Sequence, residues 1–206
     1  TMDRYQWSLF AEDTWSVTDK LALTFSGRYD ENEYFGDNFS PKAYAVYNAT
    51  ENLILKGGVI SGYKAPSLRN SSPQYMLNSM GGAIMPNPNL KPETTLTYET
   101  GFAFTFADVD MSLMVYQTDF KDKITRSSRV AGSRAPTAAE GGKDNYTQAE
   151  LDDYYANSAF YQANPYLPYN ATGYTYNYNV DEAQIRGLEL TTDYQITDYL
   201  KYRHSY

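Results

Sequence analysis

The chain has 206 residues, enough for one large domain, and 16% of them are aromatic, with 22 Tyr, 9 Phe and 2 Trp. It contains no cysteine, which excludes disulfides, zinc fingers, iron–sulfur clusters and thiol catalysis, and its one histidine, His204, excludes a histidine-rich metal site. The net charge of −8 argues against nucleic-acid binding, and the longest apolar run, 43–47, is too short for a transmembrane helix, so a β-rich chain remains.

Alternating polarity predicts a series of strands. In 5–15, one face carries the apolar residues Tyr5, Trp7, Leu9, Ala11 and Trp15, and the other carries Gln6, Ser8, Glu12 and Thr14. The same alternation occurs in 21–30 and most clearly in 95–106. Weaker strands are expected at about 42–47, 53–62, 111–123 and 178–194, and an eighth begins near Leu200. The sequence therefore predicts seven full strands and part of an eighth.

The connections between these strands alternate in length. Short links are expected near 17–19, 48–52, 107–110 and 196–198, and longer ones at 31–39, 63–93 and 127–173. A transmembrane β-barrel has this pattern, with tight periplasmic turns and long extracellular loops. Trp7 and Trp15 are eight positions apart, which is about 26 Å at about 3.3 Å per residue. Tilted by about 40°, they span roughly 20 Å, near the height of a barrel's apolar band. The fold predicted is all-β, an antiparallel transmembrane β-barrel.

Two other readings fit the same alternation. A small autonomous eight-stranded barrel or adhesin would fold alone in detergent and show a heat-modifiable gel shift. A secreted carbohydrate-binding β-sandwich would be a soluble monomer. Gln, Ser, Thr, Glu and Arg at strand centres favour a barrel with a wet lumen. Because no G-x-S-x-G, P-loop or HExxH motif occurs, the sequence predicts no enzyme and no metal site.

Several motifs carry a family resemblance. The most specific is Asn87-Pro88-Asn89-Leu90-Lys91-Pro92-Glu93, followed by Tyr98-Glu99-Thr100-Gly101. Others are Ser40-Pro41-Lys42-Ala43-Tyr44, Gly62-Tyr63-Lys64-Ala65-Pro66, and the segment 178–189, which contains Gly187 and Glu189. In order and over nearly the whole chain, they resemble TonB-dependent outer-membrane siderophore receptors. The similarity is closest to the catecholate branch typified by the colicin I receptor.

The resemblance implies the following. Residues 1–206 would form about seven to eight strands of a larger, 22-stranded type of barrel. The plug domain, the TonB box and the remaining strands would lie outside this fragment, and the loops at about 63–93 and 127–173 would be extracellular. The receptor would import a ferric catecholate siderophore across the bacterial outer membrane, energised through TonB. Outer-membrane lipid and a colicin or phage are the other partners implied. No covalently bound cofactor is expected.

Candidate site residues fall into two groups. A ferric catecholate is anionic and aromatic, so cationic and tyrosine side chains in the long loops are the expected ligand contacts: Tyr63, Lys64, Arg69, Tyr75, Arg126, Arg129 and Arg134. The motif residues are expected to be structural: Pro66, Asn87, Pro88, Leu90, Lys91, Pro92, Glu93, Glu99, Gly101, Gly187 and Glu189. Among these, the prolines stiffen a loop, whereas glycine within a strand indicates a bend or a close neighbour. The charges Glu12, Arg28, Asp30, Glu99 and Glu189 are expected on the lumen side.

Overall fold

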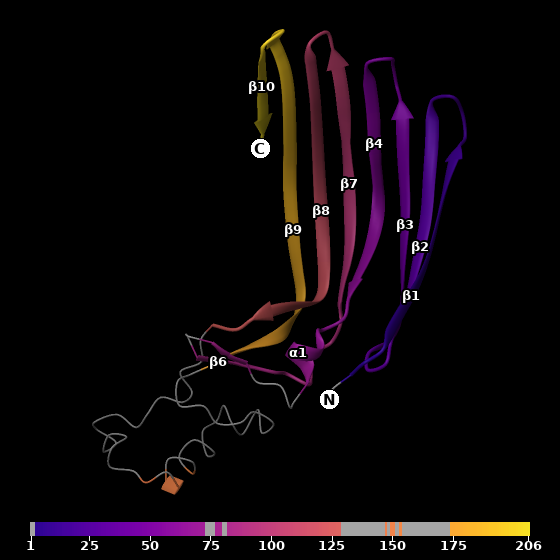
Figure 1. Cartoon of the computed structure of the whole chain (residues 1–206). Helices are drawn as coiled ribbons and strands as arrows, with labels where there is room; N and C mark the ends of the chain where they lie inside the picture. The colour runs from indigo at the N-terminus through magenta and orange to yellow at the C-terminus, as the bar shows by residue number, and fades with distance from the viewer. Residues whose placement is uncertain are drawn as a thin grey trace. The chain divides into compact units, whose positions relative to one another are not determined.

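A computed structural model describes residues 3–72, 77–79, 82–128, 147, 149–150, 153 and 174–206. In these ranges the chain forms an antiparallel series of eight long strands, shown in Figure 1. They are β1 (Gln6–Ser16), β2 (Leu21–Asn32), β3 (Gly36–Asn48), β4 (Leu53–Lys64), β7 (Glu93–Phe106), β8 (Val109–Arg126), β9 (Tyr174–Thr197) and β10 (Leu200–Ser205). The short elements between β4 and β7 are helix α1 (Leu68–Ser71) and strands β5 (Leu77–Ser79) and β6 (Gly82–Met85).

Each long strand pairs with the next along the chain, and the described sheet is open. Strands β1 and β10 are its two ends, while β6 pairs with the start of β9 in parallel. The eight predicted strands are confirmed, and the sheet is the all-β antiparallel one expected. Within the described ranges, no helix is long and apolar enough to cross a membrane.

The pairing register separates the sheet into an apolar and a polar face, because directly opposite residues in antiparallel strands lie on the same side. From β2 to β7, Phe25 lies opposite Ala43, Ala43 opposite Val59, and Val59 opposite Tyr98. On the other side, Glu12 lies opposite Ser26, which lies opposite Lys42. The alternation predicted for 5–15, 21–30 and 95–106 is therefore present in three dimensions.

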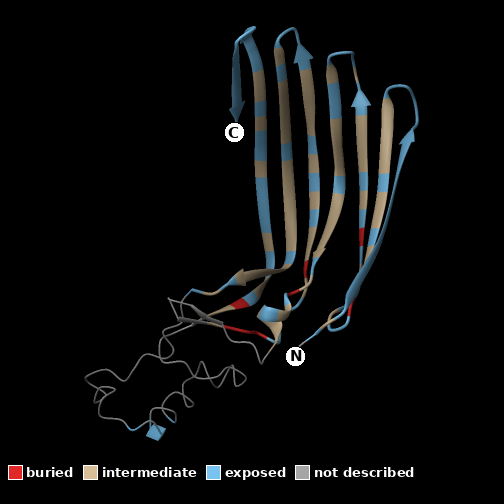
Figure 2. Cartoon of the chain, viewed as in Figure 1, coloured by how far each residue is buried: buried red, intermediate tan, exposed pale blue. Residues whose placement is uncertain are grey.

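Burial of side chains is inverted relative to a protein that folds in water. On the apolar face, Leu9 is 68% exposed and Trp15 is 65% exposed. The polar face instead holds some of the least exposed residues of the sheet, including Asp30 at 2% and Asn32 at 1%, shown in red in Figure 2. A β-sandwich would bury its apolar face. The apolar face of this sheet requires non-aqueous surroundings, so the sandwich reading is wrong.

One predicted connection differs in the structure. The longer link expected at 31–39 has only three residues, 33–35, because β2 continues to Asn32 and β3 already begins at Gly36. The Asn32 side chain accepts hydrogen bonds from the backbone N–H groups of the next turn, and Gly36 has a φ of +72°, a conformation that favours glycine. Short and long links therefore do not alternate without exception.

The remaining connections follow the expected pattern. The short links are 17–20, 49–52, 107–108 and 198–199, and they lie together at one end of the sheet in Figure 1. The chain divides into two compact units. The first contains Thr1–Ala65, Pro92–Lys123 and Asp181–Tyr206, which include most of the long strands. The second contains Pro66–Lys91 and Ile124–Val180, which include both long connections.

Candidate functional site

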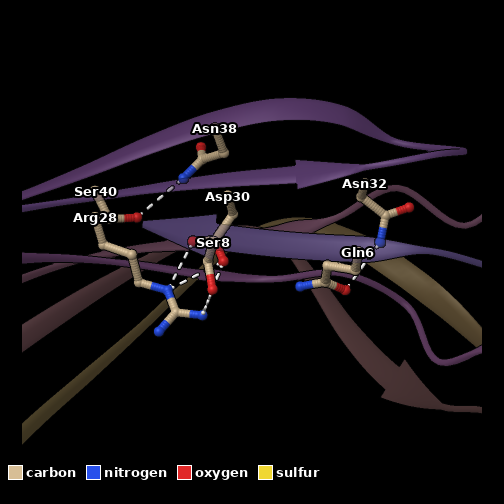
Figure 3. Close-up of polar contacts among 7 residues, drawn as sticks. All are labelled: Gln6, Ser8, Arg28, Asp30, Asn32, Asn38 and Ser40. Carbon is tan, nitrogen blue, oxygen red and sulfur yellow. Dashed lines mark hydrogen bonds and ion pairs between the residues drawn. The ribbon is translucent and has the colours of Figure 1, made fainter. Parts of the chain in front are cut away.

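A polar cluster, drawn in Figure 3, occupies the polar face of β1–β3 at the end opposite the links 17–20 and 49–52. Its centre is Asp30, whose side chain is 3% exposed. Arg28 donates from Nε to both carboxylate oxygens, at 3.0 and 2.9 Å, and from Nη2 to Oδ1 at 2.9 Å. The same Nη2 also donates to the Ser8 hydroxyl at 2.9 Å. The buried carboxylate is thus neutralised by a guanidinium that is itself 52% exposed.

The rest of the cluster consists of amides and hydroxyls. Asn32 donates to Gln6 Oε1 at 3.0 Å, and Asn38 donates to the hydroxyl of Ser40 at 2.9 Å (Figure 3). Asn32 Oδ1 also accepts from the N–H groups of Tyr34 and Phe35, at 3.1 and 3.3 Å. These contacts satisfy the buried groups and hold the short turn between β2 and β3.

Tyr63, near the end of β4, lies within electrostatic reach of this cluster. Its hydroxyl is buried and has no hydrogen-bond partner among the described residues. Asp30, Arg4 and Asp37 are the charged groups that act on it. A buried hydroxyl without a partner costs free energy, which favours a polar group from a ligand, from water or from another part of the protein at this position.

The expected ligand-contact residues occupy both units. Tyr63 and an exposed Lys64 end β4 in the first unit. Arg69 in α1 and Arg126 at the end of β8 are exposed in the second unit. Tyr75, Arg129 and Arg134 lie outside the described residues. Of the four that the structure describes, Tyr63 is the one associated with the buried polar cluster.

The part of the Asn87–Glu93 motif that lies in the second unit, residues 87–91, contributes to the buried interior of that unit. Met85 and Leu90 are its buried apolar side chains, at 1% and 3% exposure, and Pro66 and Pro86 are fully buried. Asn87 is 9% exposed and donates from Nδ2 to the Asn177 carbonyl at 2.9 Å. Pro88 and Lys91 are exposed, Pro92 is half-buried, and Glu93 begins β7 at 8% exposure.

A reciprocal amide contact joins the motif to β9. Asn179 Oδ1 accepts from the backbone N–H of Lys91 at 2.8 Å, and Asn179 Nδ2 donates to the Lys91 carbonyl at 2.9 Å. Asn177 and Asn179 lie two positions apart near the start of β9. The motif thus fastens the connection between β4 and β7 to the β-strand that follows the other long connection.

Asn179→Ala should release the Lys91 backbone amide. Losing a buried or half-buried hydrogen bond costs about 1 kcal/mol or more, so the Lys91 amide should exchange with solvent about ten-fold faster. Hydrogen exchange followed by mass spectrometry measures this on the peptide that contains Lys91. Asn89→Ala is the matched control, since its exposed side chain makes the same chemical change elsewhere in the motif. Equal exchange rates of the Lys91 amide in both variants would contradict a stabilising role for the Asn179–Lys91 hydrogen bonds.

Further charged and glycine positions lie on the polar face of the sheet. Lys42 pairs with Glu12 at 3.1 Å across the intervening strand, and Tyr44 hydrogen-bonds Glu99. Of the charges expected there, Arg28 pairs with Asp30 within one strand, and Glu189 is exposed. At Gly101, an added Cβ would collide with the Leu113 carbonyl, and at Gly187 it would collide with the Tyr116 ring. Both glycines are therefore points of close approach.

Sequence reasoning did not assign a site to the polar cluster. The sequence places Arg28, Asp30 and Gln6 on the polar face and Ser40 in a family motif, but it did not predict that they form one cluster with Asn32 and Asn38. The available signal was the run of polar residues on both faces at 30–33 and 37–38, where the apolar alternation ends. A strand that becomes polar on both faces has left the apolar band while it continues to pair.

Comparison with known proteins places the whole chain in one family. Residues 1–206 match the model described as "TonB dependent receptor-like, beta-barrel". The chain is 34% identical, over 98% of its length, to an iron-regulated outer membrane virulence protein of Vibrio cholerae. It is 30% identical, over 96% of its length, to a ferric enterobactin receptor of Pseudomonas aeruginosa. It spans 26% and 24% of these two relatives, about a quarter of each.

Solved structures agree with this match. A mutant of the P. aeruginosa ferric enterobactin receptor in complex with enterobactin superposes with a TM-score of 0.67 at 27% identity, over 97% of this chain and 26% of the other. The siderophore receptor PirA from P. aeruginosa gives a TM-score of 0.71, over 97% of this chain and 33% of the other. At 22% identity, the second similarity establishes the fold alone.

Proposed function

Because this chain belongs to the TonB-dependent receptor-like β-barrel family, we propose that it forms part of the wall and mouth of an outer-membrane receptor for ferric siderophores. The observation that carries the proposal is the inverted burial of the sheet, with exposed Leu9 and Trp15 on one face and buried Asp30 and Asn32 on the other. Such a sheet suits a barrel wall between lipid and a wet lumen. The proposed cargo is inferred from the names of the relatives, one of which is a ferric enterobactin receptor.

The two faces and two ends of the sheet then acquire an orientation. The apolar face contacts lipid, and the polar face, with the Lys42–Glu12 pair and the Arg28–Asp30 cluster, lines the lumen. The end with the short turns faces the periplasm. The opposite end, which carries the polar cluster and Tyr63, faces outward, and the long connections at about 63–93 and 127–173 are extracellular.

The cargo we propose is a ferric catecholate. Such a complex is anionic and presents aromatic rings, so it is recognised by Lys and Arg charges and by tyrosine faces and hydroxyls. Lys64, Arg69 and Arg126 supply exposed cations, and Tyr63 supplies a buried hydroxyl without a partner among the described residues. Tyr75, Arg129 and Arg134 complete the proposed set. The 30% identity with a ferric enterobactin receptor supports this class.

Import of the siderophore, energised through TonB, requires the whole receptor. We place the plug and the TonB-contacting segment in the parts of the receptor outside this quarter, and the lumen-facing charges beside the plug. Within the family, we propose that this chain belongs to the branch of the colicin I receptor, because its sequence motifs resemble those of that branch. A colicin or phage would then contact the same outer loops. The barrel itself performs no bond-making chemistry, and iron is cargo.

Neutralising a proposed ligand cation should weaken binding. A hydrogen bond to a charged group contributes about 1.5–3 kcal/mol, so Lys64→Ala, Arg69→Ala and Arg126→Ala should each lower the affinity of the full-length receptor for ferric enterobactin by about ten-fold or more. Quenching of intrinsic tryptophan fluorescence during titration measures the affinity. Lys20→Ala, in the short turn between β1 and β2, is the matched control and should bind like the parent receptor.

The results test two claims separately: which residues contact the cargo, and whether the cargo is a ferric catecholate. Normal binding by all three variants would mean that these cations do not contact the cargo. A parent receptor that binds no ferric catecholate, and that does not restore growth on one under iron restriction, would overturn the proposed function itself.

A further inference from the structure

Six polar residues lie on the apolar face of the sheet, where β8 and β9 run side by side (Figure 1). We call them the β8–β9 patch: Gln117, Asp119 and Lys121 of β8, and Glu182, Gln184 and Arg186 of β9. Gln117 lies opposite Tyr98, and Asp119 lies opposite Leu96, both on the apolar face. The side-chain bonds Arg186–Gln117 and Gln184–Asp119 place the β9 members on the same side.

The patch begins where the lipid-facing band ends. Along β8, the residues of this face are Val109, Met111, Leu113 and Val115 before Gln117. Val109 and Gln117 are eight positions apart, as are Trp15 and Trp7, so this band also spans about 20 Å of height in a tilted strand. On β1 and β2, the corresponding outer end carries Trp7 packed against Tyr29, with ring centroids 5.5 Å apart. On β8 and β9, hydrogen-bonding groups replace that aromatic pair.

Four of the six side chains of the patch, those of Gln117, Asp119, Gln184 and Arg186, are linked to one another by hydrogen bonds. Arg186 donates from Nε to Gln117 Oε1 at 3.0 Å, and Gln117 Nε2 donates to both oxygens of Asp119 at 3.1 and 3.2 Å. Gln184 Nε2 donates to Asp119 Oδ1 at 2.6 Å. The bond from Arg186 Nε to Gln117 fixes the plane of the guanidinium, so the N–H donors on its two Nη atoms point in defined directions. These four side chains are therefore preorganised.

A groove accompanies the patch. It has a volume of about 820 Å³ and is lined by Asp119, Lys121, Glu182 and Gln184, with Thr94 and Leu96 of β7. The lining combines a cation, two carboxylates and an amide with an apolar side chain. Carboxylates accept hydrogen bonds from hydroxyl groups, amides both accept and donate them, and Lys and Arg bind phosphate.

We propose that the β8–β9 patch binds the phosphorylated sugar headgroup of a glycolipid in the outer leaflet of the membrane. Lys121 and Arg186 bind the phosphate, while Gln184 and Glu182 bind sugar hydroxyls. The patch is continuous with the lipid-facing band at Val115 and Leu188, so the acyl chains of the same molecule lie on that band. The inference rests on the proposed function, because that function assigns this end of the sheet to the outer side of the membrane.

The test uses the full-length receptor in detergent with purified lipid A as the probe, and native mass spectrometry counts the molecules retained. Lys121→Gln together with Arg186→Gln should reduce retention roughly 10- to 30-fold, since each basic residue near a phosphate-bearing surface contributes about five-fold. Lys20→Gln together with Lys56→Gln removes the same charge elsewhere and should retain lipid A like the parent. Lipid A stripped of its phosphates should bind the parent receptor as weakly as phosphorylated lipid A binds the patch variant.

Each measurement can overturn the proposed binding of lipid A. Equal retention by the patch variant and the control overturns the proposal, as does equal retention of lipid A with and without phosphates. Competition by inorganic phosphate alone at the same concentration would mean a general anion site and would also overturn it. Ferric enterobactin titrations on the same preparations distinguish the two ideas. A parent receptor that binds the siderophore but not lipid A refutes only this inference, and the reverse refutes only the proposed cargo.

Discussion

Gly101→Ala is expected to prevent the receptor from assembling in the membrane. Gly101 lies opposite Met114 in the β7–β8 pair, and an added Cβ would meet the Leu113 carbonyl oxygen and approach Met114 Cα to 2.9 Å. Both obstacles are backbone atoms, so the two strands would have to separate. Overpacking at such a site costs about 3 kcal/mol or more. The folded fraction is measured by the heat-modifiable gel mobility of the full-length receptor.

Gly187→Ala is the matched comparison. Its Cβ would meet the ring of Tyr116, which is a side chain that can rotate away. The expected cost is about 1 kcal/mol, the strain of displacing one ring from its rotamer, and Tyr116→Ser should relieve it in the double variant. If Gly101→Ala assembled as well as Gly187→Ala, the close approach of β7 and β8 at Gly101 would be refuted.

Asn32→Ala should produce the second largest loss of stability. The side chain is 1% exposed and makes three hydrogen bonds: one to Gln6, and two with backbone N–H groups of the turn between β2 and β3. Its removal leaves those groups unpaired and frees the turn, at a cost of about 2 kcal/mol. Urea unfolding of the full-length receptor in lipid vesicles measures the change as a lower midpoint.

Two variants test the cause. Asn32→Asp keeps both acceptor contacts with the turn and should retain more stability than Asn32→Ala. Asn38→Ala removes a side chain that donates one bond to Ser40 and should cost about 1 kcal/mol. An Asn32→Ala receptor as stable as the Asn38→Ala receptor would show that the turn does not depend on the Asn32 side chain.

The strands were predictable where one face is uniformly apolar. From Leu96 to Phe106, the alternation identified the strand and the face that the structure exposes. It failed at the outer ends, where β3 begins at Gly36 rather than near Lys42 and β9 begins at Tyr174 rather than near Tyr178. At the start of β3, Asp37 and Asn38 put polar residues on both faces, so pairing continues without the period-two signal that reveals it. At the start of β9 the alternation of Tyr with Thr and Asn continues back to Tyr174, and the predicted strand began too late.

The candidate site was predictable in composition but not in arrangement. The motif residues Asn87 and Lys91 were recognisable from their order along the chain. Their partners Asn177 and Asn179 follow almost ninety positions later, and only the fold brings them together. Likewise, Tyr63 was a candidate by residue type, but its buried hydroxyl and the electrostatic effect of Asp30 on it depend on the tertiary structure.

The sequence by itself determined the antiparallel all-β fold, the two faces of the sheet and the family, because period-two polarity and short motifs are local properties of the chain. The tertiary structure alone decided which polar groups are buried, which glycines meet a backbone, and that the β8–β9 patch lies on the apolar face of the sheet. These features depend on the pairing register: a shift of one residue moves every side chain of a strand to the opposite face. Register is fixed by contacts between paired strands, some of which, such as β8 and β9, are separated by a long connection, and no single strand contains that information.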